Sequence, residues 1–288
     1  MIEYLLSVCI LVCLSWVWAQ SYNLSFGLTG LFNLGHIIFY GVGAYTAAIL
    51  NTKYGFNFFL NIPIAMIVSG AIAGVFGLVT LRLSGHYLAI ATLGAAMISG
   101  VVANNWMGLT RGPLGIRGIE NPTLFGYEIS ELWMIFILYL IVAVIINFIL
   151  WKIFKSPFGR LLRAIKDDEI AVKSLGKNTF EAKTWALVLS AAFAAVAGVM
   201  YAHFRLFLDP TIFALPEIIF MILALVVGGR GRFWGAILGV VLVYIVGEVP
   251  RFVGFPENIV GAARNILFAA LLILTMMYKP DGLFTIFE

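Results

Sequence analysis

Three histidines and two cysteines are the side chains of this 288-residue chain best suited to bind a metal ion. His36, His86 and His203 are too widely separated to show metal-ligand spacing, and no HExxH motif or paired carboxylate accompanies them. Cys9 and Cys13 lie four residues apart and would share one face of a helix, but two thiolates do not complete a four-ligand zinc site. The sequence therefore predicts no metal site.

Two glycine-containing motifs match nucleotide-binding loops only in part. A P-loop needs a Gly-rich cradle that ends in Gly-Lys-Ser/Thr, but AVKSLGKN has Ala171 in place of the first glycine and Asn178 in place of the hydroxyl. GVGAYT, residues 41–46, has two of the three glycines of a dinucleotide-binding motif and lies in an apolar run, where close helix packing accounts for them. We therefore expect no ATPase site, no cofactor and no enzymatic activity in this chain.

The composition is that of an integral membrane protein. Hydrophobic residues make up 62% of the chain and charged residues 11%, whereas a soluble domain has about 45–50% and about 25%. Several runs reach the ~20 apolar residues that cross a bilayer as a helix. We expect an all-α, polytopic helical membrane protein with a single transmembrane domain over residues 1–288. The net charge of +4 does not indicate nucleic-acid binding, because the basic residues form no face interleaved with aromatic residues.

Apolar runs and Gly/Pro punctuation predict about nine transmembrane spans. They lie near residues 4–20, 24–50, 61–82, 86–104, 132–152, 184–204, 212–229, 233–248 and 259–278. The second span is too long and too Gly-rich for one straight helix. It contains Gly27, Gly30, Gly35, Gly41 and Gly43. We expect it to be broken, or to form two short helices.

Lysine and arginine orient these spans. The segment 152–183 holds eight of the eighteen basic residues of the chain, which predicts a cytoplasmic loop. Alternating the spans outward from it places Lys279 and the C-terminus inside. The loop 105–131 and the N-terminus are expected outside.

Within this loop, PFGRLLRAIKDDEIAVKSLG (157–176) predicts two short helices. Apolar residues at helical spacing indicate them, namely Phe158, Leu161, Leu162 and Ile165 and then Val172 and Leu175. The second helix is expected to begin at Asp167, Asp168 and Glu169 and to end at Gly176, and a third to begin at Asn178. The segment is either a solvated connector or a docking element that presses into a groove of a soluble partner.

Six segments, taken in order, carry a family resemblance. They are NLSFGLTGLFNLGHIIFYGVGAYTAAI (23–49), LRLSGHYLAIATLG (81–94), GLTRGPLGIRGI (108–119), SPFGRLLRAIKDDEIAVKSLG (156–176), VVGGRGRFWGAILG (226–239) and KPDGLF (279–284). Together they resemble the permease subunits of branched-chain amino-acid ABC transporters, of the LivM type. The resemblance covers the chain from about residue 20 to its end.

The resemblance implies one permease subunit of an ATP-driven importer, in which residues 157–176 contact the ATP-hydrolysing subunits. The implied contact residues are Arg160, Arg163, Asp167, Asp168, Glu169 and Gly176. The implied partners are a second permease of the LivH type, two cytoplasmic ATP-binding subunits that hold ATP and Mg, an external substrate-binding protein and membrane lipid. The implied location is the prokaryotic plasma (inner) membrane.

Polar residues within or next to the spans are candidates for the translocation path. They are Asn33, His36, Tyr87, Thr92 and Glu217. The first four are equally explained as helix-packing residues and Glu217 as a residue at the outer interface. Arg111 and Arg117 are candidates for docking the binding protein, or belong to a loop that is merely rich in turns.

The expected cargo is a branched-chain or other hydrophobic amino acid. Importers of urea or short-chain amides have similar permeases and remain an alternative. An ion-coupled secondary transporter is a further alternative, but it would need a better-populated ionisable relay inside the membrane.

Overall fold

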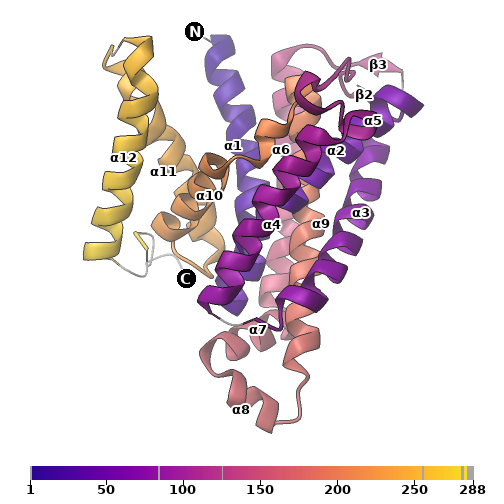
Figure 1. Cartoon of the computed structure of the whole chain (residues 1–288). Helices are drawn as coiled ribbons and strands as arrows, with labels where there is room; N and C mark the ends of the chain where they lie inside the picture. The colour runs from indigo at the N-terminus through magenta and orange to yellow at the C-terminus, as the bar shows by residue number, and fades with distance from the viewer. Residues whose placement is uncertain (1, 84, 125, 255, 280–281, 284–288) are drawn as a thin grey trace.

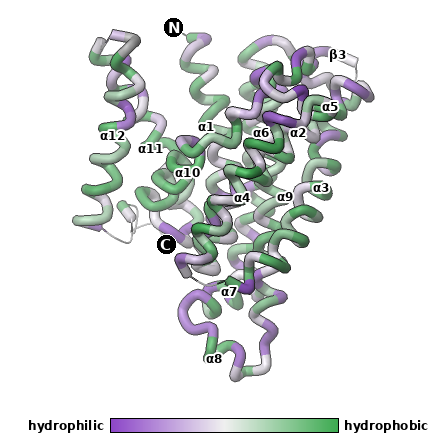
Figure 2. Tube along the Cα trace, viewed as in Figure 1, coloured by the Kyte–Doolittle hydropathy of each residue, from purple (hydrophilic) through white to green (hydrophobic). Residues whose placement is uncertain are grey.

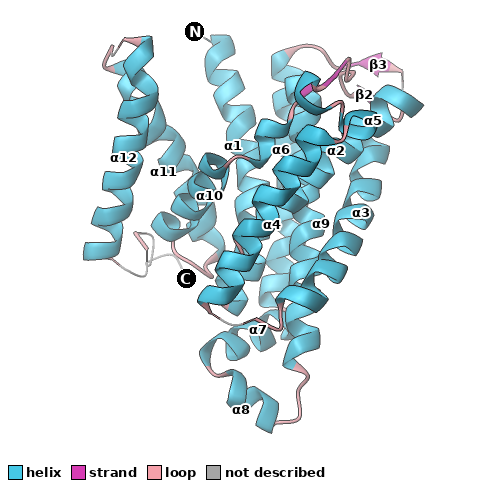
Figure 3. Cartoon of the chain, viewed as in Figure 1, coloured by secondary structure: helices cyan, strands magenta, loops and turns pink. Residues whose placement is uncertain are grey.

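The computed structural model describes residues 2–83, 85–124, 126–254, 256–279 and 282–283, so the motif KPDGLF (279–284) lies partly outside the described residues. Over these residues the regular secondary structure is helical apart from four strands of two residues, and loops and turns connect the elements (Figure 1, Figure 3). The α-helices are α1 (Ile2–Tyr22), α2 (His36–Tyr54), α3 (Phe58–Thr80), α4 (His86–Asn105), α5 (Met107–Thr110), α6 (Leu132–Lys155), α7 (Pro157–Asp167), α8 (Glu169–Ser174), α9 (Thr179–Arg205), α10 (Leu215–Gly228), α11 (Phe233–Phe252) and α12 (Glu257–Tyr278). The strands are β1 (Ile116–Arg117), β2 (Thr123–Leu124), β3 (Tyr127–Glu128) and β4 (Phe207–Leu208).

The long helices run between two polar ends of the molecule. We call them the α8 end, which holds α7 and α8, and the sheet end, which holds the four strands (Figure 1). Figure 2 shows that the helices between these ends are mostly hydrophobic, whereas the α8 end is mostly hydrophilic. The loops 105–131 and 152–183, which were predicted to lie on opposite sides of the membrane, are at opposite ends.

Seven helices of the described residues are long and apolar enough to cross a membrane. They are α1 with its extension to Gly27, α3, α4, α6, α9, α11 and α12. α10 has 14 residues and is therefore about 21 Å long, less than the ~30 Å of hydrocarbon. α2 has 19 residues but carries His36, Asn51 and Lys53. The all-α polytopic fold is confirmed, whereas the expected number of nine spans is not.

The predicted second span, 24–50, is broken, but its first part belongs to α1. The chain stays helical through a π-helical turn, η1 (Asn23–Gly27), is non-helical from residue 30 to 35 and enters α2 at His36. The predicted boundary between residues 20 and 24 was therefore wrong. The reason is that the polar residues Gln20 and Asn23, which interrupt the apolar run in the sequence, are buried inside the bundle. Gly41 and Gly43 lie within α2 and do not interrupt it.

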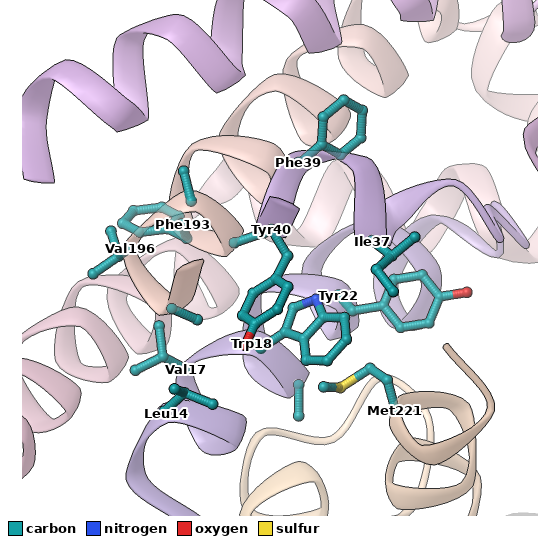
Figure 4. Close-up of a cluster of buried hydrophobic side chains, with 14 of the residues drawn as sticks. Leu14, Val17, Trp18, Tyr22, Ile37, Phe39, Tyr40, Phe193, Val196 and Met221 are labelled. Atoms are coloured by element: carbon teal, nitrogen blue, oxygen red, sulfur yellow. The ribbon is translucent and has the colours of Figure 1, made fainter. Parts of the chain in front are cut away.

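α9 is the central helix, and small residues let α2 approach it closely. A Cβ at Gly43 would lie 2.4 Å from the backbone of Ala195, and a Cβ at Gly198 would lie 2.1 Å from the carbonyl oxygen of Tyr40. Such contacts between small residues are how helices associate inside a membrane, where apolar lipid provides no hydrophobic driving force. Side chains of α1, α2, α9 and α10 meet beside this contact (Figure 4), where Trp18 stacks on Tyr40 with ring centroids 4.3 Å apart.

A 3₁₀ turn, η3 (Pro210–Phe213), lies between α9 and α10 in the chain and packs against α4 and α2. Phe213 packs where Gly41 leaves room, because a Cβ there would lie 2.1 Å from its ring, and it stacks on Tyr45. Irregular backbone at membrane depth is tolerated only where protein buries it. Ile212 and Phe213 are accordingly buried, so this turn belongs to the core.

Candidate functional site

Local capping signals form the two helices at the α8 end. The Ser156 side chain accepts a hydrogen bond from Gly159 N at 3.2 Å at the start of α7. The Asp168 side chain accepts hydrogen bonds from the backbone N–H groups of residues 170 and 171 at 2.9 and 3.0 Å at the start of α8. Gly176 follows α8 with φ +75°, a conformation that favours glycine. The two predicted helices are confirmed, although the second begins at Glu169 because Asp167 still belongs to α7.

Glu169 fastens α8 to the start of α9. Its carboxylate accepts a hydrogen bond from Thr179 Oγ1 at 2.9 Å, pairs with Lys173 at 3.1 Å and also pairs with Lys183. Burial alone would raise the pKa of Glu169, but hydrogen bonds from Lys183, Thr179 and Lys173 outweigh it and lower the pKa to about 2. The described contacts of this carboxylate lie within the chain, and its predicted contact with a partner subunit stays a prediction.

Neutralising Glu169 is expected to loosen α8. An unfolded glutamate titrates near pH ~4.3, whereas the folded pKa of Glu169 is about 2. The pairing therefore contributes fully to stability above the unfolded value, and its contribution is lost as the pH falls towards 2. Glu169→Gln should therefore raise amide hydrogen exchange in α8 about fivefold at pH 7, the effect of an exposed ion pair. Exchange measured by mass spectrometry checks this, with Glu128→Gln at the sheet end as the control. An unchanged α8 would contradict it.

The candidate contact residues gather on one projecting element, the α7–α8 pair (Figure 1). Arg160, Arg163, Asp167 and Asp168 are exposed, and a Cβ at Gly176 would meet nothing within 4 Å. Sequence reasoning missed the most exposed apolar side chains of this element, Ile170 at 77% and Leu175 at 80%.

The exposure of Leu175 differs from the sequence prediction. Leu175 was expected to share the buried pattern with Val172, but only Val172 is buried, because the helix ends at Ser174 and Leu175 no longer follows its periodicity. A signal for Ile170 was present, since it precedes Val172 by two positions and so lies on the opposite helix face. Ile170 and Leu175 are thus two exposed apolar side chains on a charged projection.

One hydrogen bond joins α7 to the end of α1, and two more join the end of α1 to the loop between α10 and α11. Lys166 Nζ donates to the carbonyl of Gly27 at 2.9 Å, in the π-helical turn of α1. In the same turn the Asn23 side chain accepts from Gly231 N at 2.9 Å and donates to the carbonyl of Arg232 at 2.9 Å. α7, the end of α1 and the loop between α10 and α11 therefore form one connected unit.

Two of the candidate path residues, Asn33 and His36, line a small cavity in the bundle. Its lining residues are Trp18, Tyr22, Asn33, His36, Ile37, Ile218 and Met221, and its volume is about 10 Å³. That is room for about one water molecule, so a path through this point is closed in this conformation. His36 is buried and lies 3.2 Å from Ser21 Oγ and 3.5 Å from Ser190 Oγ.

The remaining candidates divide between the core and the surface. Thr92 is buried beside the turn that precedes α2, where its Oγ1 accepts a hydrogen bond from Leu34 N at 3.0 Å. Tyr87 is 75% exposed in the first turn of α4, and Glu217 is exposed in the first turn of α10. The structure thus brings Asn33, His36 and Thr92 together and leaves the other two apart.

Arg111 and Arg117 lie exposed at the sheet end. β1 pairs antiparallel with β4, Ile116 opposite Leu208, and the Arg117 guanidinium lies 5.8 Å from the Phe207 ring centroid. Positive φ angles at Gly112, Gly115 and Gly118 confirm that this loop is rich in turns. Its predicted role in docking a binding protein stays a prediction.

The structure combines apolar helices, a closed central cavity and a charged helical projection at one end. These features define the class of protein to which the chain belongs. The chain is a multi-pass membrane protein of the all-α type. The charged residues Arg160, Arg163, Asp167 and Asp168 of the projection are exposed, and His36 in the core lies within hydrogen-bond distance of Ser21 and Ser190.

Comparison with known proteins identifies the family. The family described as "Branched-chain amino acid transport system / permease component" matches residues 4–276. The chain belongs to this family of membrane permeases.

Several relatives carry corresponding names. The high-affinity branched-chain amino acid transport system permease proteins LivM of Salmonella typhimurium and Escherichia coli are 35% and 34% identical, and each alignment covers 91% of this chain and 65% of the relative. The chain thus spans just under two thirds of the length of these LivM proteins. The corresponding LivH protein of Escherichia coli is 24% identical over 92% of this chain and 89% of its own length. No solved structure matches the chain.

Proposed function

We propose that this chain is a permease subunit of an ATP-driven ABC importer and that it translocates branched-chain or other hydrophobic amino acids. The observation that carries the proposal is α8, a capped, charged helix with two exposed apolar side chains at the tip of a membrane bundle. Such a surface suits a soluble partner. The names of the LivM and LivH relatives support the cargo.

The proposed assembly contains a second permease of the LivH type, two cytoplasmic ATP-binding subunits that hold ATP and Mg, and an external substrate-binding protein. In this proposal the α8 end lies in the cytoplasm of a prokaryotic cell, at its inner membrane, which the basic residues of the segment 152–183 support. The sheet end with Arg111 and Arg117 and the N-terminus then face outward. In this assembly the chain itself performs no chemistry.

In the proposed mechanism, ATP binding and hydrolysis in the partner subunits displace α8. Glu169 passes the displacement to α9, and Lys166 passes it to the end of α1. α1 and α10 contribute Trp18, Tyr22, Ile218 and Met221 to the closed cavity. Movement of these helices relative to α2 would open the cavity towards one side of the membrane at a time.

Removing the Lys166 contact is expected to uncouple transport without dissociating the complex. Lys166→Met keeps the length and apolar stem of the side chain but deletes its donor to the Gly27 carbonyl. Uptake should fall about tenfold, because a charge-assisted hydrogen bond contributes about 1.5–3 kcal/mol, while the ATP-binding subunits still co-purify. Lys177→Met, on the exposed part of the same loop, is the control. Wild-type uptake by Lys166→Met would contradict this link.

The cargo can be tested directly. Cells or proteoliposomes with the complete transporter should accumulate labelled leucine but not urea, because the cavity lining is mostly apolar, with Trp18, Ile37 and Met221 among its residues. Uptake should require ATP and withstand collapse of the proton and sodium gradients. Uptake of urea alone would favour the amide alternative, and loss of uptake with the gradients would favour an ion-coupled transporter.

A further inference from the structure

A second and larger cavity opens at the α8 end, apart from the path cavity. Its volume is about 550 Å³. It lies between the end of α6, the helix α7 and the start of α11. Its lining residues are Gly27, Trp151, Phe154, Lys155, Arg163, Lys166, Asp167, Arg230, Gly231, Arg232, Phe233 and Trp234. The proposed function gives this cavity no role.

The lining carries five basic side chains and one carboxylate, that of Asp167. Four of the basic groups contact neutral groups among the described residues. Lys155 Nζ lies 4.6 Å from the Trp151 ring centroid, Arg163 donates to the Phe154 carbonyl at 3.2 Å, Lys166 donates to the Gly27 carbonyl at 2.9 Å, and the Arg230 guanidinium lies 5.8 Å from the Phe26 ring centroid. Their mutual repulsion is therefore compensated only in part.

The pKa of Lys166 reports this repulsion. Burial lowers it, the neighbouring Arg230 and Arg163 guanidinium groups lower it further, and Asp167 opposes them. An anion in the cavity would remove part of this unfavourable interaction. The cavity is thus complementary in charge to a phosphate or carboxylate.

Aromatic side chains indicate which kind of anion fits. Trp151 lies in the last turns of α6, and Phe233 and Trp234 begin α11. Both helices are long and apolar enough to cross the membrane, so the cavity lies where they leave it. Tryptophan is enriched at that level of a bilayer. Above the cavity, Ile141, Ile145 and Phe148 of α6 are 51, 53 and 53% exposed and offer an apolar surface for acyl chains.

We propose that this cavity binds the headgroup of an anionic phospholipid, with its phosphate among Lys155, Arg163, Lys166 and Arg230 and its acyl chains along α6. Basic pockets between membrane helices on the cytoplasmic side suit such headgroups. A soluble phosphate would not use the aromatic rim. The inference requires only that the α8 end lies at the cytoplasmic leaflet, and it is independent of the cargo.

The proposed lipid would act on the connected unit described above. Lys166 belongs to that unit through its hydrogen bond to Gly27, and Asn23 of the same turn bonds to the loop that holds Gly231 and Arg232. A bound phosphate would draw the cations of α7 and of this loop together. The lipid would therefore stabilise the contact between the projecting helices and the membrane bundle.

The test is a lipid titration of the complete, purified transporter in a neutral detergent, followed by native mass spectrometry. The cavity variant is Lys155→Gln with Arg230→Gln, because the contacts shown for these two side chains among the described residues are with aromatic rings, so no hydrogen bond shown there is lost. The control is Arg82→Gln with Lys177→Gln, two exposed cations outside the cavity with the same change in charge. Wild type and control should bind dioleoylphosphatidylglycerol in preference to dioleoylphosphatidylcholine. The cavity variant should bind the anionic lipid about thirtyfold more weakly, since each cation near the surface contributes a factor of about five.

Four results would overturn the proposal. They are no preference of the wild type for the anionic lipid, an equal loss in both variants, displacement of the lipid by inorganic phosphate at similar concentration, and loss of the ATP-binding subunits from the cavity variant with lipid binding unchanged. The third would assign the cavity to a soluble phosphate, and the fourth to a protein contact. None of these outcomes decides whether the wild-type transporter takes up leucine, so failure here is distinct from failure of the proposed function.

Discussion

A chain that carries Ile170→Asp and Leu175→Asp is expected to fold in the membrane but to lose its ATP-binding subunits. Both side chains are among the most exposed apolar groups of the molecule, at 77% and 80%, so charge at these positions is harmless to the chain alone. In an interface each buried anchor contributes about 2 kcal/mol or more. Affinity for the partner should therefore fall at least about hundredfold, and uptake should be abolished.

Co-purification from gently solubilised membranes, read by mass spectrometry, measures this effect. Leu114→Asp is a matched control, because Leu114 is 64% exposed at the sheet end and undergoes the same chemical change. That variant should retain the ATP-binding subunits. If the α8 variant kept both its partners and its uptake, α8 would be a solvated connector and the proposed coupling would fail.

Gly198→Ala is expected to destabilise the bundle strongly, although alanine is ordinarily the better helix former. The new Cβ would lie 2.1 Å from the Tyr40 carbonyl oxygen and 2.7 Å from Ala44 N. These are backbone atoms of α2 and cannot rotate away, so α2 and α9 must separate. We expect a loss of about 3 kcal/mol, at the upper end of overpacking in a core.

The matched control is Gly94→Ala, because a Cβ at Gly94 in α4 would meet nothing within 4 Å. Thermal unfolding in detergent can be followed by a thiol-reactive dye in a Cys9→Ser background, since Cys13 is buried and Cys9 is exposed. The Gly198 variant should expose Cys13 at a markedly lower temperature, and the Gly94 variant at the wild-type temperature or above. Equal midpoints would show that α2 and α9 adapt without cost.

Features with local causes were predictable from the sequence. The ends of α7 and α8 follow from Ser156, Asp168 and Gly176, each of which acts on its own turn of chain. The start of α9 follows from Asn178, which accepts from Glu181 N at 3.1 Å in the predicted capping box. Such signals need no knowledge of tertiary structure.

Features that depend on contacts between residues far apart in the chain could not be predicted from the sequence. Asn23 lies between two predicted spans in the sequence, and only its hydrogen bond with Gly231 N shows that it belongs inside the bundle. His36 was a candidate from the sequence, but its neighbours Ser21 and Ser190 were not. These two serines come from two other helices, and no sequence pattern marks them. Tyr87 and Thr92 lie five residues apart and so point to different faces of α4, which is why only Thr92 is buried.

The central helix α9 has a geometrical consequence. It runs without interruption from Thr179 to Arg205, 27 residues, or about 40 Å. One end is fastened to α8 through Glu169 and the other continues into β4, which pairs with the strand that holds Arg117. Because α2 contacts this rigid helix near its middle, a tilt of α9 about that contact would move its two ends in opposite directions. A movement at one membrane surface would then produce the opposite movement at the other surface. A partner bound at either end of α9 would therefore shift the position of the other end.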